Sequence, residues 1–246
     1  MEMAVHVFVA GASGVIGRRL VPLLRGAGYE VFGTTRRPAN AGALAAAGAT
    51  PIIVDVFDAP ALSAALANVR PNVVIHQLTD LPPSLDPAHM EEAINRNARI
   101  RREGTRNLVN AAIASGSGRL IAQSIAWAYA PGPEPHHERD PLDIHAKGQR
   151  AISVGGVAAL EDLTLHSPPL EGLVLRYGHL YGPGTGADPT ATADRVHVDA
   201  AACAALLATG KGAPGAFNIA EPNALASIDK AQRELGWDPN FRLETA

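Results

Sequence analysis

The chain has 246 residues, enough for one domain with a sizeable core, and carries a formal net charge of −3 with 18% charged residues. This balance gives no electrostatic basis for binding nucleic acid or an anionic membrane, and an aromatic content of 4% argues against an aromatic-lined nucleic-acid surface. The single cysteine, Cys203, excludes an internal disulfide, and no apolar run is long enough to span a bilayer, so we expect a cytoplasmic protein without nucleic-acid or membrane partners.

The first stretch of the chain predicts a dinucleotide-binding turn. Residues 5–10 form an apolar, β-branched run typical of a buried strand, and apolar residues recur at helical spacing after residue 14. Between them, Gly11 can make a tight turn, Gly14 lets the backbone approach a pyrophosphate, and Gly17 permits close packing of helix on strand. The amino end of the helix would then face the phosphates. The predicted cofactor contacts of this turn are Gly11, Ser13, Gly14, Val15, Ile16 and Gly17.

Strands and helices alternate along the rest of the chain. Predicted strands cover residues 30–34, 51–54, 73–77, 120–124, 173–176 and 216–219. Predicted helices cover residues 39–47, 61–69, 89–114, 151–165, 199–208 and 227–235, and loops cover residues 131–141 and 182–193. This alternation predicts an α/β, Rossmann-type doubly wound parallel sheet with helices on both faces. We assign residues 1–177 mainly to the cofactor-binding domain and residues 178–246 to a small, reduced substrate-side region interleaved with the sheet.

Two strand ends indicate how the adenosine half of the cofactor is held. The strand at residues 30–34 leads into Arg36 and Arg37, where an NAD-specific site would carry a carboxylate. Guanidinium groups bind phosphate in a bidentate manner, so the sequence predicts NADP(H) rather than NAD(H), unless one arginine merely faces solvent. After the next strand, Asp55 and Val56 are positioned to receive the adenine, although Asp55 could instead be an acidic residue at a helix amino end.

The strand at residues 73–77 ends at the ribose and nicotinamide side of the same edge. We expect Gln77, Leu78 and Thr79 to line that part of the cofactor site. His76 precedes them, and we interpret it as a hydrogen-bonded core histidine rather than a catalytic group.

Several short motifs occur in order over nearly the whole chain. They are the turn at residues 11–17, Asp55, the strand end at residues 76–79, and the segments at residues 103–108, 176–184, 197–201, 217–220 and 235–239. Together they resemble the extended short-chain dehydrogenase/reductase superfamily, in its NAD-dependent epimerase/dehydratase group. The resemblance implies a homodimer formed through the helices at residues 89–114 and 151–165. It identifies no substrate.

The chain departs from this family where the family performs its proton chemistry. The resemblance implies a Ser or Thr that positions the substrate, a Tyr that exchanges the proton, and a Lys four residues later that lowers the pKa of that Tyr. No tyrosine of this chain has a lysine four positions on. With Glu161 as the anchor, the Tyr position holds Ser153 and the Lys position holds Val157, and the family's Asn before Gly-Thr corresponds to Arg101.

Other side chains at the same edge are candidates to replace the missing pair. Ser124 closes a strand and either orients the substrate or has a structural role. Tyr129 follows in the next loop and is the first candidate for proton donor, and His179 is the second because an imidazole can act as acid or base. Trp127 and Tyr181 are expected on the substrate side.

Other kinds of chemistry lack their residues. The histidines at positions 136, 137 and 145 do not have a spacing that forces metal geometry, so no metal is predicted, and there is no Gly-x-Ser-x-Gly nucleophile motif. The sequence therefore predicts an atypical NADP(H)-dependent oxidoreductase acting on a small carbonyl-type substrate. Two alternatives stay open: a sugar epimerase or dehydratase, which the small C-terminal region disfavours, and a non-enzymatic NADP(H)-binding or sensing protein.

Overall fold

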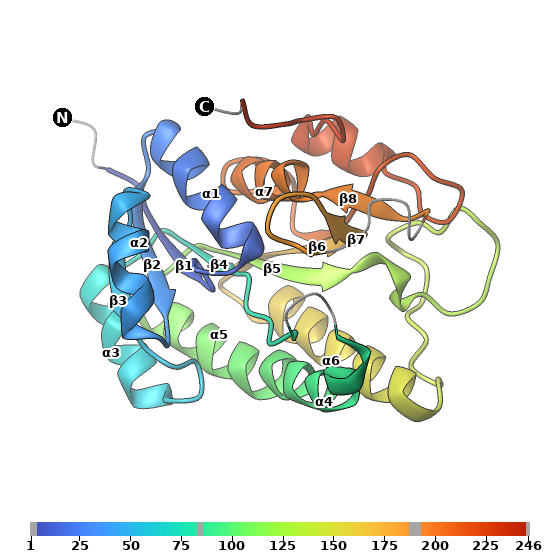
Figure 1. Cartoon of the computed structure of the whole chain (residues 1–246), viewed down its shortest axis with the longest axis horizontal. Helices are drawn as coiled ribbons and strands as arrows, with labels where there is room; N and C mark the ends of the chain where they lie inside the picture. The colour runs from blue at the N-terminus through green and yellow to red at the C-terminus, as the bar shows by residue number, and fades with distance from the viewer. Residues whose placement is uncertain (1–3, 83–85, 187–192, 245–246) are drawn as a thin grey trace.

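Seven parallel strands form the central sheet of the protein (Figure 1). The computed structural model describes residues 4–82, 86–186 and 193–244. The strands are β1 (His6–Ala10), β2 (Glu30–Thr35), β3 (Thr50–Ile53), β4 (Val73–His76), β5 (Arg119–Ile125), β6 (Glu171–Tyr177) and β9 (Gly215–Ile219). Their spatial order is β3-β2-β1-β4-β5-β6-β9, so the winding direction reverses between β1 and β4. Ligands of such sheets bind outside the carboxyl ends of the strands at this reversal.

Helices cover both faces of the sheet, which confirms the predicted doubly wound fold (Figure 1). One layer contains α1 (Val15–Gly26), α2 (Ala41–Ala46) and α7 (Val198–Leu207). The other contains α3 (Ala59–Val69), α4 (Met90–Arg99), α5 (Thr105–Ala114) and α6 (Gly148–Leu165). Within the layers α1 packs on α7, α3 on α5, and α4 on α6.

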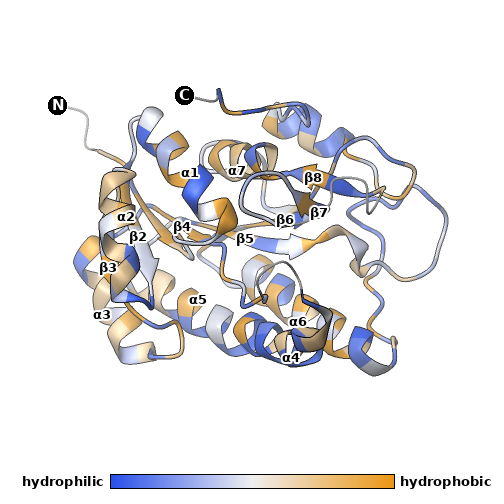
Figure 2. Cartoon of the chain, in the orientation of Figure 1, coloured by the Kyte–Doolittle hydropathy of each residue, from blue (hydrophilic) through white to orange (hydrophobic). Residues whose placement is uncertain are grey.

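Side chains of β1 show why the sheet is buried on both faces. Val7 and Val9 lie in the core shared with α1 and α7, whereas Phe8 and Ala10 lie in the core shared with α3 and α5. Successive residues of a strand point to opposite faces, so a strand between two helix layers must be apolar throughout. Figure 2 accordingly shows hydrophobic colour along the central strands and hydrophilic colour on the outer helix α4.

The helix predicted over residues 89–114 is divided in the structure. A short 3₁₀ turn, η3 (Pro87–His89), precedes α4, and a π-helical turn, η4 (Ile100–Gly104), separates α4 from α5. Gly104 in this turn lies against the chain after β3, since a Cβ there would stand 3.0 Å from Cγ1 of Val56. The π turn therefore lets the helix change its path and still pack closely at the carboxyl edge of the sheet.

The C-terminal region differs most from the prediction. β7 (His179–Tyr181) and β8 (Arg195–His197) pair in parallel as a separate small sheet, and both are too short to show a hydrophobic period. The helix predicted over residues 227–235 is helical from residue 229 and ends in the π turn η6 (Ala231–Leu235). Residues 187–192 of the predicted loop lie outside the described residues. Two short 3₁₀ turns, η1 (Pro38–Asn40) and η5 (Ala126–Ala128), follow β2 and β5.

No helix in the described ranges is long and apolar enough to cross a membrane.

Candidate active site

The glycine turn between β1 and α1 has no space for a side chain at two of its three glycines. Gly11 has a φ of +90°, and a Cβ there would lie 2.6 Å from the carbonyl oxygen of Gln77. A Cβ on Gly17 would overlap the carbonyl oxygen of Gly11 itself. Gly14 differs, because it caps α1 in extended backbone and a Cβ there would meet one described atom, the Gly11 carbonyl oxygen at 3.2 Å. Packing therefore requires glycine at two positions, and Gly14 leaves the amino end of α1 open.

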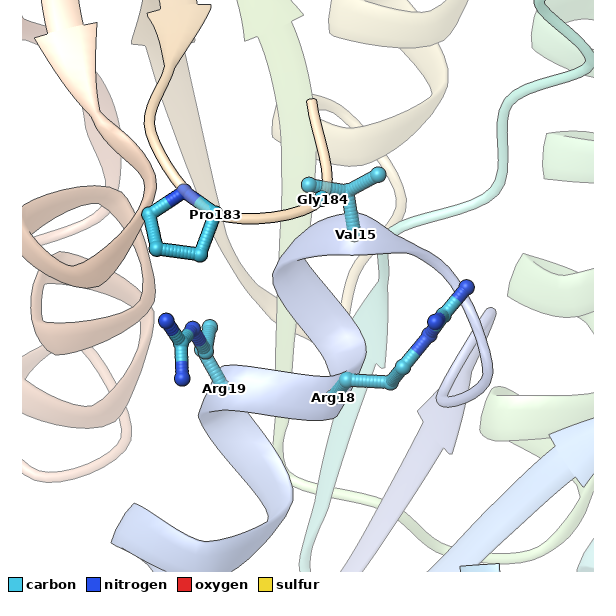
Figure 3. A pocket seen from close by; sticks show the side chains of 5 residues that line it. All are labelled: Val15, Arg18, Arg19, Pro183 and Gly184. Atoms are coloured by element: carbon cyan, nitrogen blue, oxygen red, sulfur yellow. The ribbon is translucent and has the colours of Figure 1, made fainter. Parts of the chain in front are cut away.

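That open helix end fits the pyrophosphate of a dinucleotide. The N-cap makes no side-chain hydrogen bond, and the first turn of α1 contains no acidic residue, so nothing in the cap offsets the positive end of the helix dipole. A hollow of about 230 Å³ lies beside this turn and is lined by Val15, Arg18, Arg19, Pro183 and Gly184 (Figure 3). The two arginines add positive charge that the sequence analysis did not use, although both directly follow the last glycine of the turn.

The two arginine side chains at this hollow are held by the glycine turn and by α7. Arg18 donates from Nε to the carbonyl oxygen of Ser13 at 2.9 Å, and Arg19 pairs through Nε with Asp199 of α7 at 3.0 Å. Ile16 is buried in the core, so it can offer a ligand only its backbone N–H group. The loop after β7 closes the hollow from the opposite side of the helix turn (Figure 3).

At the end of β2 the two predicted arginines are exposed, but they differ in their contacts. Nη2 of Arg36 lies 3.3 Å from Oδ2 of Asp80, which follows β4, and Nε of Arg96 lies at the same distance from the same oxygen. The side chain of Arg37 has no polar partner within the described part of the chain, and its backbone N–H donates to the hydroxyl of Thr35. Arg36 therefore links the end of β2 to the segment that follows β4, and Arg37 is available to a ligand.

At the end of β3 the predicted adenine contacts divide between surface and core. Asp55 is exposed and accepts a hydrogen bond from the backbone N–H of Phe57 at 3.0 Å. Val56 is buried, and its carbonyl oxygen accepts a hydrogen bond from the side-chain amide of Asn107 at 3.0 Å. Asn107 on α5 thus fixes this strand end, a positioning role that the sequence analysis did not assign.

The residues after β4 line the middle of the edge. Gln77 is buried and donates from its side-chain amide to the hydroxyl of Tyr177 at 3.3 Å, while its side-chain oxygen is buried without a partner among the described residues. Leu78 is half-buried and Thr79 is exposed. His76 accepts at Nδ1 from the backbone N–H of Leu78 at 3.2 Å, and its Nε2 lies 3.0 Å from the hydroxyl of Thr105.

These contacts confirm that His76 is a core histidine. Burial, and secondly the charge of Arg101, lower the pKa of His76 from 6.5 to about 4, so the ring is neutral at physiological pH. With Nδ1 accepting, the proton is placed on Nε2 and directed at Thr105.

Ser124, at the end of β5, belongs to a buried hydrogen-bond network with Glu161 and Arg176. Ser124 is fully buried and donates to Oε1 of Glu161 at 2.6 Å. Arg176 donates to both oxygens of the same carboxylate, from Nε to Oε1 at 3.0 Å and from Nη2 to Oε2 at 2.6 Å. The Glu161 carboxylate on α6 therefore ties β5 to β6, and Ser124 has a structural hydrogen bond in this arrangement.

Tyr129, which the sequence analysis ranked first as proton donor, belongs to the same buried network. Its side chain is 5% exposed, donates its hydroxyl proton to Oδ1 of Asn218 at 2.6 Å, and accepts from Nη1 of Arg176 at 2.8 Å. The ring stacks on His136, with the ring centres 4.8 Å apart. Burial raises the pKa of Tyr129 above its ordinary value, although the charge of Arg176 opposes this rise. The phenol proton is thus already engaged within the protein.

The catalytic candidate His179 and the predicted substrate-side residues Trp127 and Tyr181 are at least partly exposed. Trp127 stacks on His179, with ring centres 3.9 Å apart and planes within 16°, and both side chains are more than one third exposed. Nδ1 of His179 lies 3.0 Å from Oδ1 of Asp194, which orients the ring. Tyr181 instead donates to the Glu221 carboxylate. The structure therefore brings together Trp127 and His179, whereas the hydroxyl of Tyr129 is bound by Asn218 and Arg176.

The α6 positions of the family's Tyr–Lys pair carry no replacement for it. Val157 is fully buried and Ser153 is half-buried. Beside them, a Cβ on Gly156 would stand 3.0 Å from Cα of Ala98 and 3.4 Å from Cδ of Arg101, and a Cβ on Gly155 would stand 2.9 Å from Nη2 of Arg102. Two arginine side chains of the π turn thus reach α6, which the sequence analysis did not anticipate beyond the alignment of Arg101 with the family's Asn.

The histidine-rich loop has structural contacts of its own. His136 stacks on Tyr129 and lies 3.6 Å from an Asp140 carboxylate oxygen through Nδ1. Within the described ranges there is no group of three or more His, Cys, Asp or Glu side chains that could hold a metal ion.

Comparisons with known proteins agree on family and fold. A family model described as "NAD dependent epimerase/dehydratase family" matches residues 7–214. A 3-diazoavenalumate denitrifying reductase from a Streptomyces species is 41% identical over 265 residues, covering 98% of this chain and 85% of that protein. A dTDP-4-dehydrorhamnose reductase from Streptomyces griseus is 29% identical over 178 residues, covering 72% of this chain and 50% of that protein.

Solved structures extend the likeness to the whole fold. UDP-glucose 4-epimerase from Thermotoga maritima, solved with UDP-glucose, has a TM-score of 0.75 at 21% identity and covers 96% of this chain and 94% of its own. The Bordetella bronchiseptica enzyme WbmG, solved with NAD, has a TM-score of 0.73 at 20% identity, and the match covers 98% of this chain and 91% of the WbmG chain. At these identities the likeness shows a shared fold.

Proposed function

Because the chain belongs to the NAD dependent epimerase/dehydratase family, we propose that it is an NADP(H)-dependent reductase that acts on a small, electron-poor substrate without the family's Tyr–Lys relay. The reduced form of the cofactor supplies a hydride when bound. The protein's own residues bind it at the glycine turn, orient it across the β1–β4 reversal, and determine whether a proton accompanies the hydride.

The choice of NADP(H) rests on the end of β2. Arg36 and Arg37 are exposed there, and the residues that follow β2 include no carboxylate. A 2′-phosphate would accept charge-assisted hydrogen bonds from either guanidinium. Arg36 and Arg96 both contact Oδ2 of Asp80. If Arg36 turned to the phosphate, Asp80 would therefore keep Arg96 as its partner.

The observation that carries the proposal is the absence of an acid–base pair on α6, where Ser153 and Val157 stand. Reduction of a carbonyl leaves an oxyanion that needs a proton or a hydrogen-bond donor. A diazonium group already carries the positive charge that a hydride neutralises, and the group leaves as dinitrogen, so no proton is required. The Streptomyces relative is, by its name, a denitrifying reductase of a diazo compound. We therefore propose a small arenediazonium compound as the first substrate class.

A small carbonyl compound is the second substrate class, and one contact supports it. His179 is held by Asp194 through Nδ1, which leaves Nε2 of a half-exposed ring available as a proton donor. For this class His179 takes the role of acid, because the Tyr129 proton is directed at Asn218.

Turnover of NADPH against a substrate panel tests the proposal. The panel contains an arenediazonium carboxylic acid, an aromatic aldehyde and UDP-glucose, with a protein-free control because diazonium salts react with NADPH on their own. We expect protein-dependent NADPH oxidation with one dinitrogen released per NADPH for the diazonium substrate, and deuterium transfer from deuterated NADPH into the product. Conversion of UDP-glucose to its epimer would replace the proposal with epimerase activity. Tight NADPH binding without turnover of any substrate would favour a sensing protein.

A further inference from the structure

Arg101 is a cation without a counter-ion of its own. It lies in the π turn η4, and its guanidinium makes no hydrogen bond or ion pair with any residue that the structure describes. Nearby arginines of the same helical segment are paired: Arg96 with Glu92 and Asp80, and Arg99 with Glu103. Arg102, in the same turn, also makes no hydrogen bond or ion pair with a described residue, but its side chain is exposed whereas that of Arg101 is half-buried.

The side chain lies inward, between the helix layer and the end of the sheet. Its Cδ passes over Gly156 of α6, and its charge acts on His76 at the end of β4 and on Glu161 of α6. Burial lowers the pKa of Arg101 to about 10 despite the attraction of Glu161, and the group stays charged at neutral pH. Arg101 therefore brings a positive charge to the carboxyl edge where β4 and β5 end.

Glu161 does not need this cation as a partner. Both of its oxygens accept hydrogen bonds from Arg176, and one of them also accepts from Ser124. A buried charge without a partner of its own lowers stability unless a ligand compensates it. An arginine that only covers apolar surface extends its guanidinium into water. The neighbouring Arg102 is exposed, and its Nη2 lies 2.9 Å from where a Cβ on Gly155 of α6 would stand.

We propose that Arg101 binds a carboxylate group of the substrate. The inference rests on the proposed function in taking this edge as the substrate site, and it adds the substrate class: small organic carboxylates. A guanidinium matches a carboxylate through two parallel hydrogen bonds. One guanidinium with a glutamate nearby suits a monoanion better than a dianionic phosphate, because Glu161 would repel the second negative charge.

Binding of a matched pair of compounds tests this assignment without turnover. Cinnamate and its neutral analogue cinnamamide are titrated calorimetrically into the protein, with and without NADP⁺. Arg101→Gln should weaken cinnamate by about tenfold to a hundredfold, because a charge-assisted pair is lost, and should leave cinnamamide within about twofold. Arg101→Lys should retain part of the preference for cinnamate. Arg102→Gln, in the same π turn, is the matched control and should change neither affinity.

Three results would overturn the assignment. They are equal weakening of both compounds by Arg101→Gln, no preference for cinnamate in the unmodified protein, and no cinnamate binding up to about 1 mM. Thermal unfolding of each variant shows whether the fold is kept. Carboxylate selectivity without NADPH turnover would refute the proposed function and leave the Arg101 site standing, so the two failures are distinguishable.

Discussion

The two halves of the sheet's carboxyl edge are built from different parts of the chain. At β1 and β2 the site consists of backbone: a turn in which Gly11 and Gly17 have no room for a side chain, and an open helix end at Gly14. At β5 and β6 it consists of side chains from segments far apart in sequence, such as Ser124 and Arg176 bound to Glu161.

This difference shows which features of a family persist when its chemistry changes. A backbone site is fixed by steric contacts, so it remains recognisable whatever reaction follows. A side-chain site can be replaced residue by residue, and here the α6 positions that we aligned with the family's acid–base pair hold Ser153 and Val157, with the Arg101 side chain beside them. Variants in each half test this contrast.

The largest effect is expected from breaking the side-chain half at Glu161. Glu161→Leu removes the carboxylate that holds buried Arg176, and an uncompensated buried charge costs about 3–5 kcal/mol of the free energy of unfolding. Urea denaturation measures the loss. Glu103→Leu removes an exposed carboxylate paired with Arg99 and should leave stability nearly unchanged. A loss below about 1 kcal/mol for Glu161→Leu would mean that Arg176 finds another partner.

At the boundary between the halves, His76 should make stability depend on pH. Its folded pKa of about 4 lies below the unfolded value of 6.5, so the unfolded state binds more protons between these values. The contribution of His76 is fully present above pH 6.5 and is lost as the pH falls through this window, by about 3 kcal/mol at most. His76→Asn should flatten the pH dependence of the free energy of unfolding, whereas the exposed His166→Asn should not. Identical slopes for His76→Asn and the unmodified protein would show that the ring is not held neutral.

In the backbone half, Gly14→Val should remove cofactor binding and leave the fold intact. A Cβ at this position meets a single described atom, at 3.2 Å, but a β-branched side chain would occupy the approach to the helix end. We expect NADPH affinity to fall by roughly a hundredfold or more, about 2.7 kcal/mol, in a fluorescence titration. Gly26→Val in the same helix is the control, because a Cβ there meets no described atom within 4 Å. Unchanged affinity in a folded Gly14→Val variant would contradict the pyrophosphate assignment.

The predictability of the two halves from sequence follows the same division. The strand–glycine–helix order at residues 6–26 and the apolar strands predicted the parallel sheet, because both depend on local patterns. The π turn Ile100–Gly104 was missed since its sequence continues a helical pattern, and the strands β7 and β8 were missed since three residues carry no period.

The side-chain half could not be predicted in the same way. The sequence identified Tyr129 and Ser124 as polar residues near the right strand ends, but not that Asn218 and Glu161 would receive their hydrogen bonds. Partners separated by 37 and 89 positions are decided by tertiary packing. The departure from the family's Tyr–Lys pair was the signal available in the sequence, and the position of Arg101 over Gly156 needed the structure.

The smallest effect is expected where the backbone half depends on side chains, at Arg36 and Arg37. Both side chains are exposed, so binding the 2′-phosphate replaces contacts with water, and Arg36 would also give up its contact with Asp80. These losses offset part of the binding free energy that the phosphate contacts supply. The double variant Arg36→Ala, Arg37→Ala should weaken NADPH by about tenfold to a hundredfold and NADH by about threefold or less, since NADH lacks that phosphate. Arg233→Ala removes an exposed positive charge from η6 and controls for the change in net charge. Equal weakening of both cofactors would show that these arginines do not read the 2′-phosphate. Arg37→Ala alone should weaken NADPH binding more than Arg36→Ala alone. The Arg37 guanidinium has no partner among the described residues, so it gives up no protein contact when it binds the phosphate.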